Sequence, residues 1–145
     1  KIGKMGGTDL PLQARILLLN IDPAVGRVMQ RATKKVLDRT YEFPTQTGRS
    51  VESLDGQLEG VDLVIMSIGN VPALQDKSYA QLDDLVEQGT KTIVMSGGGN
   101  SATAYGRGAN GYIALPANSE LMAQTLQDVL TVGKDAGRIR YDQAH

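Results

Sequence analysis

The 145-residue sequence contains no cysteine and no tryptophan, one phenylalanine and one histidine, His145, which is the last residue. The lack of cysteine excludes disulfide bonds, thiolate metal sites and a cysteine nucleophile. Apart from its last residue, the chain has no histidine to serve as a general base. The formal net charge of −1 gives no long-range field that would attract anions, so we expect no direct contact with nucleic acid.

Long apolar stretches are also missing, since none approaches the ~18 residues of a membrane span and none resembles the core of a signal peptide. We therefore expect no membrane association and a cytoplasmic location. The ends of the chain are polar or glycine-containing. They predict an N-terminal linker or tag over residues 1–13, a folded domain over 14–132 and a C-terminal linker or tail over 133–145.

What the sequence does contain is a series of short apolar runs, at residues 15–19, 41–44, 62–66, 92–95 and 111–115. In stretches such as "LVIM" and "TIVM" consecutive residues are apolar, which is typical of strands buried on both faces of a sheet.

Helical spacing of apolar residues separates these runs. Asp22 and Pro23 suit the N-cap and the first position of a helix that follows the first run. Similar faces lie around residues 79–86 and 121–129. Residues 51–58 have room for one or two helical turns, and residues 101–107 for a short helix.

The alternation of strands and helices predicts an α/β protein of three layers, with a parallel sheet between two layers of helices. Ligands of such sheets lie at the carboxyl ends of the strands. In this chain those ends carry the stretches "NID" at 20–22, "SGGG" at 96–99, Ser67, and Leu115 with Pro116.

Four stretches in this order resemble the receiver domain of two-component response regulators. They are "RILLLNIDPAVGRVMQRA", "VDLVIMSIGNVP", "TIVMSGG" and "GANGYIALPANSELMAQTLQDVL". The resemblance covers residues 14–132 and implies a (βα)5 flavodoxin-like fold with strand order 2-1-3-4-5. The segment between Ser96 and Gly108 is shorter than in the family, which predicts a short or distorted fourth helix.

The same resemblance assigns roles to the strand ends. The acidic pair that binds magnesium in the family aligns with Asn20 and Ile21, next to Asp22. The phosphoaccepting aspartate aligns with Ser67 when counted from the strand, and with Ile68 when counted back from the following proline. Neither residue is a carboxylate.

Two of the remaining positions keep the family's residue type. Ser96 aligns with a hydroxyl residue that contacts the phosphoryl group, and Tyr112 aligns with an aromatic switch residue. Leu115 stands where the family has a lysine, and its bond to Pro116 corresponds to a cis peptide bond. Tyr112 either gates a partner surface or is a fixed aromatic packed on the fifth strand.

These replacements remove the chemistry of phosphorylation. Phosphoryl transfer to a carboxylate needs that carboxylate and a divalent ion held by anionic oxygen ligands. Ile21 offers no oxygen, Leu115 offers no donor, and Asp22 has a helix to cap. We therefore expect a degenerate pseudo-receiver that is not an enzyme, with no cofactor and no metal site.

The expected function is phosphorylation-independent signalling through protein contacts in a two-component or hybrid-kinase system. The partner would be a histidine kinase, a fused output domain, or a second copy bound through the face of the family's fourth helix, fifth strand and last helix. An alternative is a sensor of a small ligand such as a cyclic dinucleotide, held by Gly97, Gly98, Gly99 and Arg107 beside Tyr112. A less favoured reading is a receiver phosphorylated on an unusual acceptor.

Overall fold

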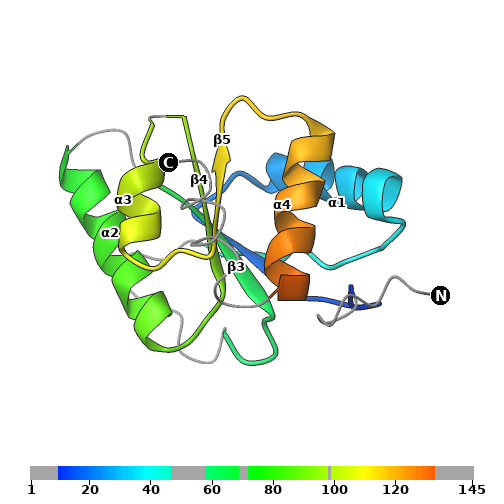
Figure 1. The fold of residues 1–145 in the computed structure, drawn as a ribbon, viewed down its shortest axis with the longest axis horizontal. Coiled ribbons are helices and arrows are strands. Elements are labelled where there is room, and N and C mark those ends of the chain that lie inside the picture. Colours follow the sequence, from blue (N-terminus) through cyan, green and yellow to red (C-terminus); the bar gives the residue numbers. More distant parts are fainter. Residues whose placement is uncertain (1–9, 47–57, 69–71, 98, 133–145) are drawn as a thin grey trace.

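A parallel sheet of five strands forms the middle layer of the structure (Figure 1). The computed structural model describes residues 10–46, 58–68, 72–97 and 99–132. The strands are β1 (Ile16–Leu19), β2 (Thr45–Gln46), β3 (Leu63–Ser67), β4 (Thr92–Ser96) and β5 (Gly111–Ala114). Their order, β2-β1-β3-β4-β5, is the order that the sequence predicted.

Two helices cover each face of this sheet. On one face lie α1 (Pro23–Leu37) and α4 (Ser119–Val132), which pack against each other. On the other face lie α2 (Pro72–Glu87) and α3 (Ser101–Gly106) (Figure 1). The predicted three-layer α/β architecture is therefore confirmed, and the six-residue α3 confirms the short fourth helix of the family's scheme.

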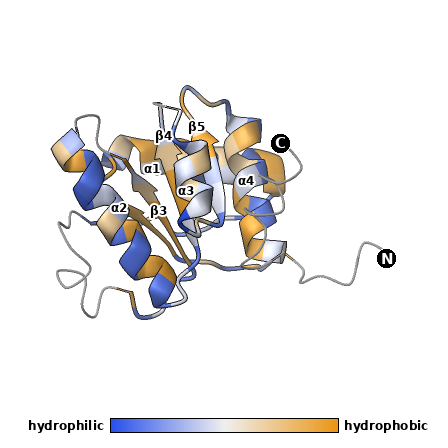
Figure 2. Ribbon diagram, turned by 60° about the vertical axis from the view of Figure 1, so that its left-hand side comes forward, coloured by the Kyte–Doolittle hydropathy of each residue, from blue (hydrophilic) through white to orange (hydrophobic). Residues whose placement is uncertain are grey.

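The core divides along the sheet because successive strand residues point to opposite faces. Leu18 of β1 packs with Met29 and Leu126 on the α1–α4 side. Its neighbour Leu19 packs with Leu82 on the α2–α3 side. Figure 2 shows the central strands β3 and β4 in the colour of hydrophobic residues, while α2 turns a hydrophilic side outward. Strands buried on both faces explain the continuous apolar runs of the sequence.

The second strand lies further along the chain than predicted. Residues 41–44 were expected to form it, whereas β2 is Thr45–Gln46. The predicted segment does run beside β1, since Glu42 and Pro44 accept hydrogen bonds from backbone N–H groups of β1. Pro44 has no N–H to give in return, so a regular ladder starts only after it. The apolar character of the run instead reflects Tyr41, which is buried in the core.

The start of α1 follows the sequence prediction. Asp22 is the N-cap, and its Oδ1 accepts a 2.8 Å hydrogen bond from the Ala24 backbone N–H. Pro23 takes the first helical position, where its missing N–H costs nothing. This carboxylate therefore serves the end of a helix at the carboxyl edge of the sheet.

Other predictions fall partly outside the described residues. The helical turns expected over 51–58 lie there except for the last residue, and so do residues 1–9 and 133–145 of the predicted end segments. The domain boundaries stay a prediction. Within the described part, Leu10 packs against the core and the Tyr41 hydroxyl donates a 2.6 Å hydrogen bond to the Pro11 carbonyl oxygen. No helix of the described residues is long and apolar enough to cross a membrane.

Candidate functional site

The carboxyl edge of the sheet brings together the predicted site residues of β1 and β3. The Ser67 hydroxyl, at the end of β3, donates a 2.9 Å hydrogen bond to the backbone carbonyl oxygen of Asn20. Asn20 has a φ of 58°, a left-handed conformation that asparagine tolerates better than most residues. This turn follows β1 directly and leads the chain into the cap of α1.

The Asn20 side chain reaches a residue that the sequence analysis did not identify. Its Nδ2 lies 3.4 Å from Oε1 of Gln81, a side chain on α2 that is only 3% exposed. A buried amide needs hydrogen-bond partners, and this contact supplies one across the sheet edge. Gln81 stands on the buried side of a helix far from any strand end in sequence, so no local signal marked it.

A second polar group lies at the ends of β4 and β5. Nδ2 of Asn100 donates a 2.8 Å hydrogen bond to the Ser96 hydroxyl, and the Asn100 backbone N–H donates a 3.0 Å bond to the Tyr112 hydroxyl. The Tyr112 hydroxyl also lies 3.5 Å from the Ser96 carbonyl oxygen. Asn100 thus ties the two residues of the site that keep the family's type to the start of α3.

Leu115 and Pro116 close the edge beyond β5. Their peptide bond is cis, as the resemblance predicted. The Leu115 side chain is 44% exposed, while its backbone N–H donates a 2.9 Å hydrogen bond to the Ser96 carbonyl oxygen. A Cβ on Gly97 would lie 3.8 Å from the Leu115 carbonyl oxygen, an ordinary contact. Gly99 has a φ of 71°, and Gly98 is outside the described residues.

The donors at this edge do not fit a magnesium site. The Ser67 hydroxyl bonds the Asn20 backbone, the Asn20 amide bonds Gln81, and Ile21 packs against the core. Asp22 is the single carboxylate among these positions, and it caps α1. Magnesium favours carboxylate oxygens in octahedral geometry. Among the described residues no group of three or more His, Cys, Asp or Glu is placed to hold a metal ion.

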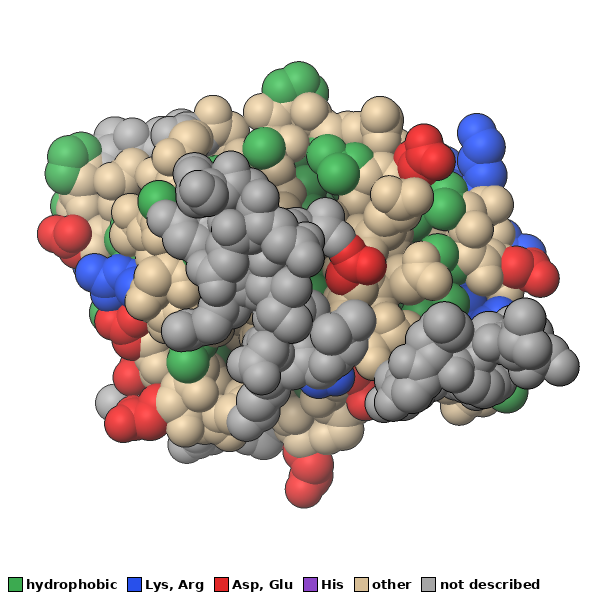
Figure 3. Space-filling view, in the orientation of Figure 1, with side chains coloured by type: hydrophobic (Ala, Val, Ile, Leu, Met, Phe, Trp, Pro, Cys, Tyr) green, Lys and Arg blue, Asp and Glu red, His purple; other side chains and the backbone are tan. Residues whose placement is uncertain are grey.

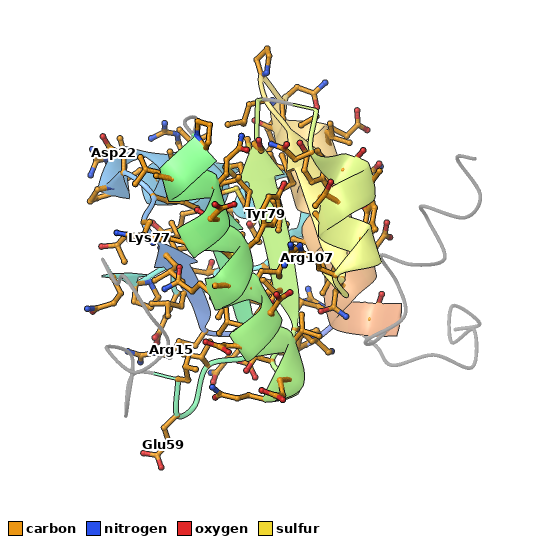
Figure 4. All side chains as sticks on the ribbon, turned by 90° about the vertical axis from the view of Figure 1, so that its left-hand side faces the viewer. Arg15, Asp22, Glu59, Lys77, Tyr79 and Arg107 are labelled. Atoms are coloured by element: carbon orange, nitrogen blue, oxygen red, sulfur yellow. The ribbon has the colours of Figure 1, made fainter. Side chains whose placement is uncertain are left out.

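Arg107 makes contacts away from the glycine loop. Its guanidinium pairs with Asp83 of α2 at 2.6 Å and lies 4.8 Å from the centre of the Tyr79 ring. Figure 4 shows Tyr79 and Arg107 between α2 and α3, with Asp22 at the carboxyl edge above them. The chain runs through α3 back toward the start of β5, which carries Arg107 away from that edge. Ligand binding by Arg107 and the glycines stays a prediction.

Three tyrosines fill the space between α2, α3 and β5. The rings of Tyr105 and Tyr112 lie 6.4 Å apart, centre to centre, and are tilted by 56°. Burial, with Tyr112 nearby, raises the pKa of Tyr79, and Arg107 opposes this rise. The sequence indicates Tyr112 through the resemblance and Tyr79 through helical spacing, but it does not indicate their association, because that depends on how two helices pack on the sheet.

No model of a known protein family matches the chain. Two curated relatives, each named "Bifunctional protein GlmU" and both from Corynebacterium glutamicum, are 35% and 34% identical over 89 residues, which is 60% of this chain. The chain spans only 18% of the length of these relatives.

Solved structures resemble the whole sheet and its helices. A response regulator from Thermotoga maritima superimposes with a TM-score of 0.62 and 16% identity over 82% of this chain and 98% of the other. Chemotaxis response regulator CheY4 of Vibrio cholerae superimposes with a TM-score of 0.60 and 19% identity over 81% of this chain and 99% of the other. A putative pilus assembly-related protein from Burkholderia pseudomallei superimposes with a TM-score of 0.60 and 16% identity over 86% of this chain and 90% of the other. The chain therefore has the fold of response regulator receiver domains.

Proposed function

We propose that this chain is a regulatory domain of receiver fold that acts by protein–protein contact in two-component signalling and takes up no phosphoryl group. The observation that carries the proposal is the Ser67–Asn20 hydrogen bond. In a receiver, a phosphoaccepting carboxylate and a metal-binding carboxylate stand at these two positions. Here two neutral groups occupy them and bond to each other. Response regulators from several bacteria share the fold, which supports the signalling part of the proposal.

The chemistry of the strand ends supports phosphorylation independence. A serine hydroxyl is a weak nucleophile without a base beside it, and the Ser67 hydroxyl already donates to a carbonyl oxygen. In the alternative alignment the acceptor position is Ile68, an apolar side chain that is 8% exposed. Leu115 gives no cation to stabilise a phosphoryl oxygen. The described residues of this edge therefore do not together supply a nucleophile, a counter-ion and metal ligands, and we assign no enzymatic activity to them.

The face made of α3, β5 and α4 is the surface we assign to the partner. Leu115 is 44% exposed and Leu121, in the first turn of α4, is 40% exposed. We assign these two exposed apolar side chains to contact with another protein, where burial would remove them from water. Tyr112 on the same face is held by Asn100 and lies against Tyr105. Tyr112 therefore keeps one fixed position and does not switch between a buried and an exposed one. A partner, such as a histidine kinase or a fused output domain, would always meet this face in the same arrangement.

The test is an amide NMR titration of the labelled chain, first with magnesium and then with magnesium and beryllofluoride, which mimics a phosphoryl group. We expect no saturable shifts at Asn20, Ser67 or Ser96. A matched variant, Asn20→Asp combined with Ile21→Asp and Ser67→Asp, restores an acidic cluster beside Asp22 and should gain magnesium-dependent shifts. Saturable shifts in the unmodified chain that extend to Tyr112 would refute the proposal.

A further inference from the structure

Two helices on opposite faces of the sheet carry opposite charge. Between Pro23 and Leu37, α1 has four basic residues and no acidic one. Between Pro72 and Glu87, α2 has four acidic residues and one lysine. In Figure 3, Lys and Arg side chains gather at the right-hand edge, where Figure 1 places α1, with some Asp and Glu beside them, and Asp and Glu side chains predominate at the left-hand edge, where it places α2. The small net charge of the chain hides this separation.

Most of these charges have no ion-pair partner within the part of the chain that the structure describes. One residue of each set is paired inside the molecule, Lys34 with Asp38 and Asp83 with Arg107. Three exposed cations are left on α1 and three exposed anions on α2. They are Arg27, Arg31 and Lys35 on α1, and Asp76, Asp84 and Glu87 on α2.

The two sets also match in spacing. Arg27 and Lys35 are eight residues apart on one side of α1, and Asp76 and Asp84 are eight residues apart on α2. At 1.5 Å per residue each pair spans about 12 Å along its helix. Arg31 lies midway between the two cations, and the small, exposed Ala80 lies midway between the two anions. Two such helices laid side by side can align both charge pairs, with Arg31 of one helix over the small Ala80 of the other.

The surface of α1 is hollowed where the cations gather. Gln30, Arg31, Lys34, Lys35 and Thr40 line a shallow depression of about 390 Å³. The stems of lysine and arginine offer apolar walls below charged tips. This depression can receive side chains from a facing helix, so the cationic surface has shape as well as charge.

The folding of each helix explains only one of the two charge runs. Cations near the C-terminal end of α1 interact favourably with its helix dipole. Asp84 and Glu87 lie in the C-terminal part of α2, where a negative charge opposes the dipole, and no basic residue offsets them in the last turn. The acidic residues at the end of α2 therefore do not stabilise their own helix, and helix stability does not explain them.

We infer that α1 of one copy of this chain binds α2 of a second copy, head to tail. The two surfaces differ and lie on opposite faces, so each added copy leaves one cationic and one anionic surface free, and short chains of copies form. The contact rests on exposed charges and is therefore weak and sensitive to salt. This inference does not depend on the proposed loss of phosphorylation, since it uses none of the residues at the carboxyl edge.

The experiment is sedimentation velocity of the full 145-residue chain over a range of concentrations, at low and at high ionic strength. We expect self-association at low salt that high salt reverses. Arg27→Glu with Lys35→Glu, and separately Asp76→Lys with Asp84→Lys, should each weaken it by about tenfold or more, because like charges then face each other. A control, Glu59→Lys with Glu120→Lys, changes the net charge as the second variant does but alters exposed residues outside α1 and α2.

Mixing the two variants gives the decisive result. Each variant alone carries two surfaces of like charge, whereas in the mixture every α1 meets an α2 of opposite charge on the other variant, so the mixture should associate again with the two variants alternating. Placing all four substitutions in one chain should restore self-association with the charges exchanged. Circular dichroism confirms that each variant is folded.

Three results would overturn the inference. One is a chain that stays monomeric at low salt, and another is self-association that only one of the two variants reduces. The third is binding of α1 to a DNA duplex or to anionic vesicles, lost in Arg27→Glu with Lys35→Glu, without any self-association. That result would assign the cationic surface to a polyanion.

Discussion

The Ser67 hydroxyl donates a 2.9 Å hydrogen bond to the Asn20 carbonyl oxygen and so joins the ends of β3 and β1. The two residues are 47 positions apart in the chain. In the family that the sequence resembles, these two strand ends carry carboxylates that a metal ion holds together. Here a hydroxyl and a backbone carbonyl perform the structural part of that task, with no charge to neutralise.

Substitutions of Ser67 test this role. Ser67→Ala removes the donor and should lower the free energy of unfolding by about 0.5–1.5 kcal/mol. Ser67→Asp should cost more at neutral pH, because a carboxylate then faces the Asn20 carbonyl oxygen. Urea unfolding measures both. Ser78→Ala on α2, which removes a hydroxyl bonded within its own helix, is the control and should change stability little. An equally stable Ser67→Asp variant would show that the edge tolerates a carboxylate.

The Arg107–Asp83 pair should contribute little on its own. Both side chains are half exposed, so a double-mutant cycle with Arg107→Ala and Asp83→Ala should give a coupling energy of about 0.2–1 kcal/mol that high salt reduces. Arg107→Ala alone should lower the free energy of unfolding more than Asp83→Ala does, since it also removes the cation over the Tyr79 ring. Equal losses for the two single variants would mean that the ring contact contributes nothing measurable.

Two glycines close together in the sequence should respond in opposite ways to alanine. Gly108 has a φ of 104°, and an added Cβ would lie 2.8 Å from Cγ1 of Val86, so Gly108→Ala should cost at least about 1 kcal/mol. Gly106 is in α3 with open space around it, so Gly106→Ala should stabilise the protein by roughly 0.5–1 kcal/mol. Thermal unfolding of both variants measures the difference. Equal melting temperatures would contradict the backbone argument.

Stability should decline at alkaline pH through two tyrosines. Burial raises the pKa of Tyr41 and of Tyr79 in the folded chain. The unfolded chain therefore releases these protons first, and the free energy of unfolding falls as pH rises past the ordinary value of about 10. Unfolding titrations between neutral and alkaline pH, with Tyr41→Phe and Tyr79→Phe, should show a shallower decline in each variant. If the free energy of unfolding fell with pH at the same rate in all three proteins, neither tyrosine would be the cause of the decline.

The cap of α1 provides a check on the role of Asp22. Asp22→Ala should lower the free energy of unfolding by about 0.5–2 kcal/mol, and Asp22→Asn by less, because asparagine also accepts from the Ala24 backbone N–H. Chemical denaturation of the three proteins gives the comparison. A metal ligand would behave differently, since both substitutions would then abolish any stabilisation by added magnesium.

Local patterns in the sequence were sufficient for the architecture. Consecutive apolar residues as in β3 and β4 are typical of strands buried on both faces, and the Asp22–Pro23 pair favours a helix start. Parallel strands bring their carboxyl ends to one edge, so the meeting of Asn20 with Ser67 followed from topology. The second strand was misplaced because Tyr41 is apolar for burial in the core, while Pro44 delays the ladder.

The sequence by itself determined the strand order through the resemblance, the layers through periodicity, and the absence of acidic ligands at Asn20, Ile21 and Ser67 through their identities. Only the tertiary structure decided which side chains meet across elements, as Arg107 meets Asp83 and Asn20 meets Gln81. Such pairs depend on the rotation and offset of helices on the sheet. These are determined by the packing of many side chains at once and leave no mark at either residue's own position in the sequence.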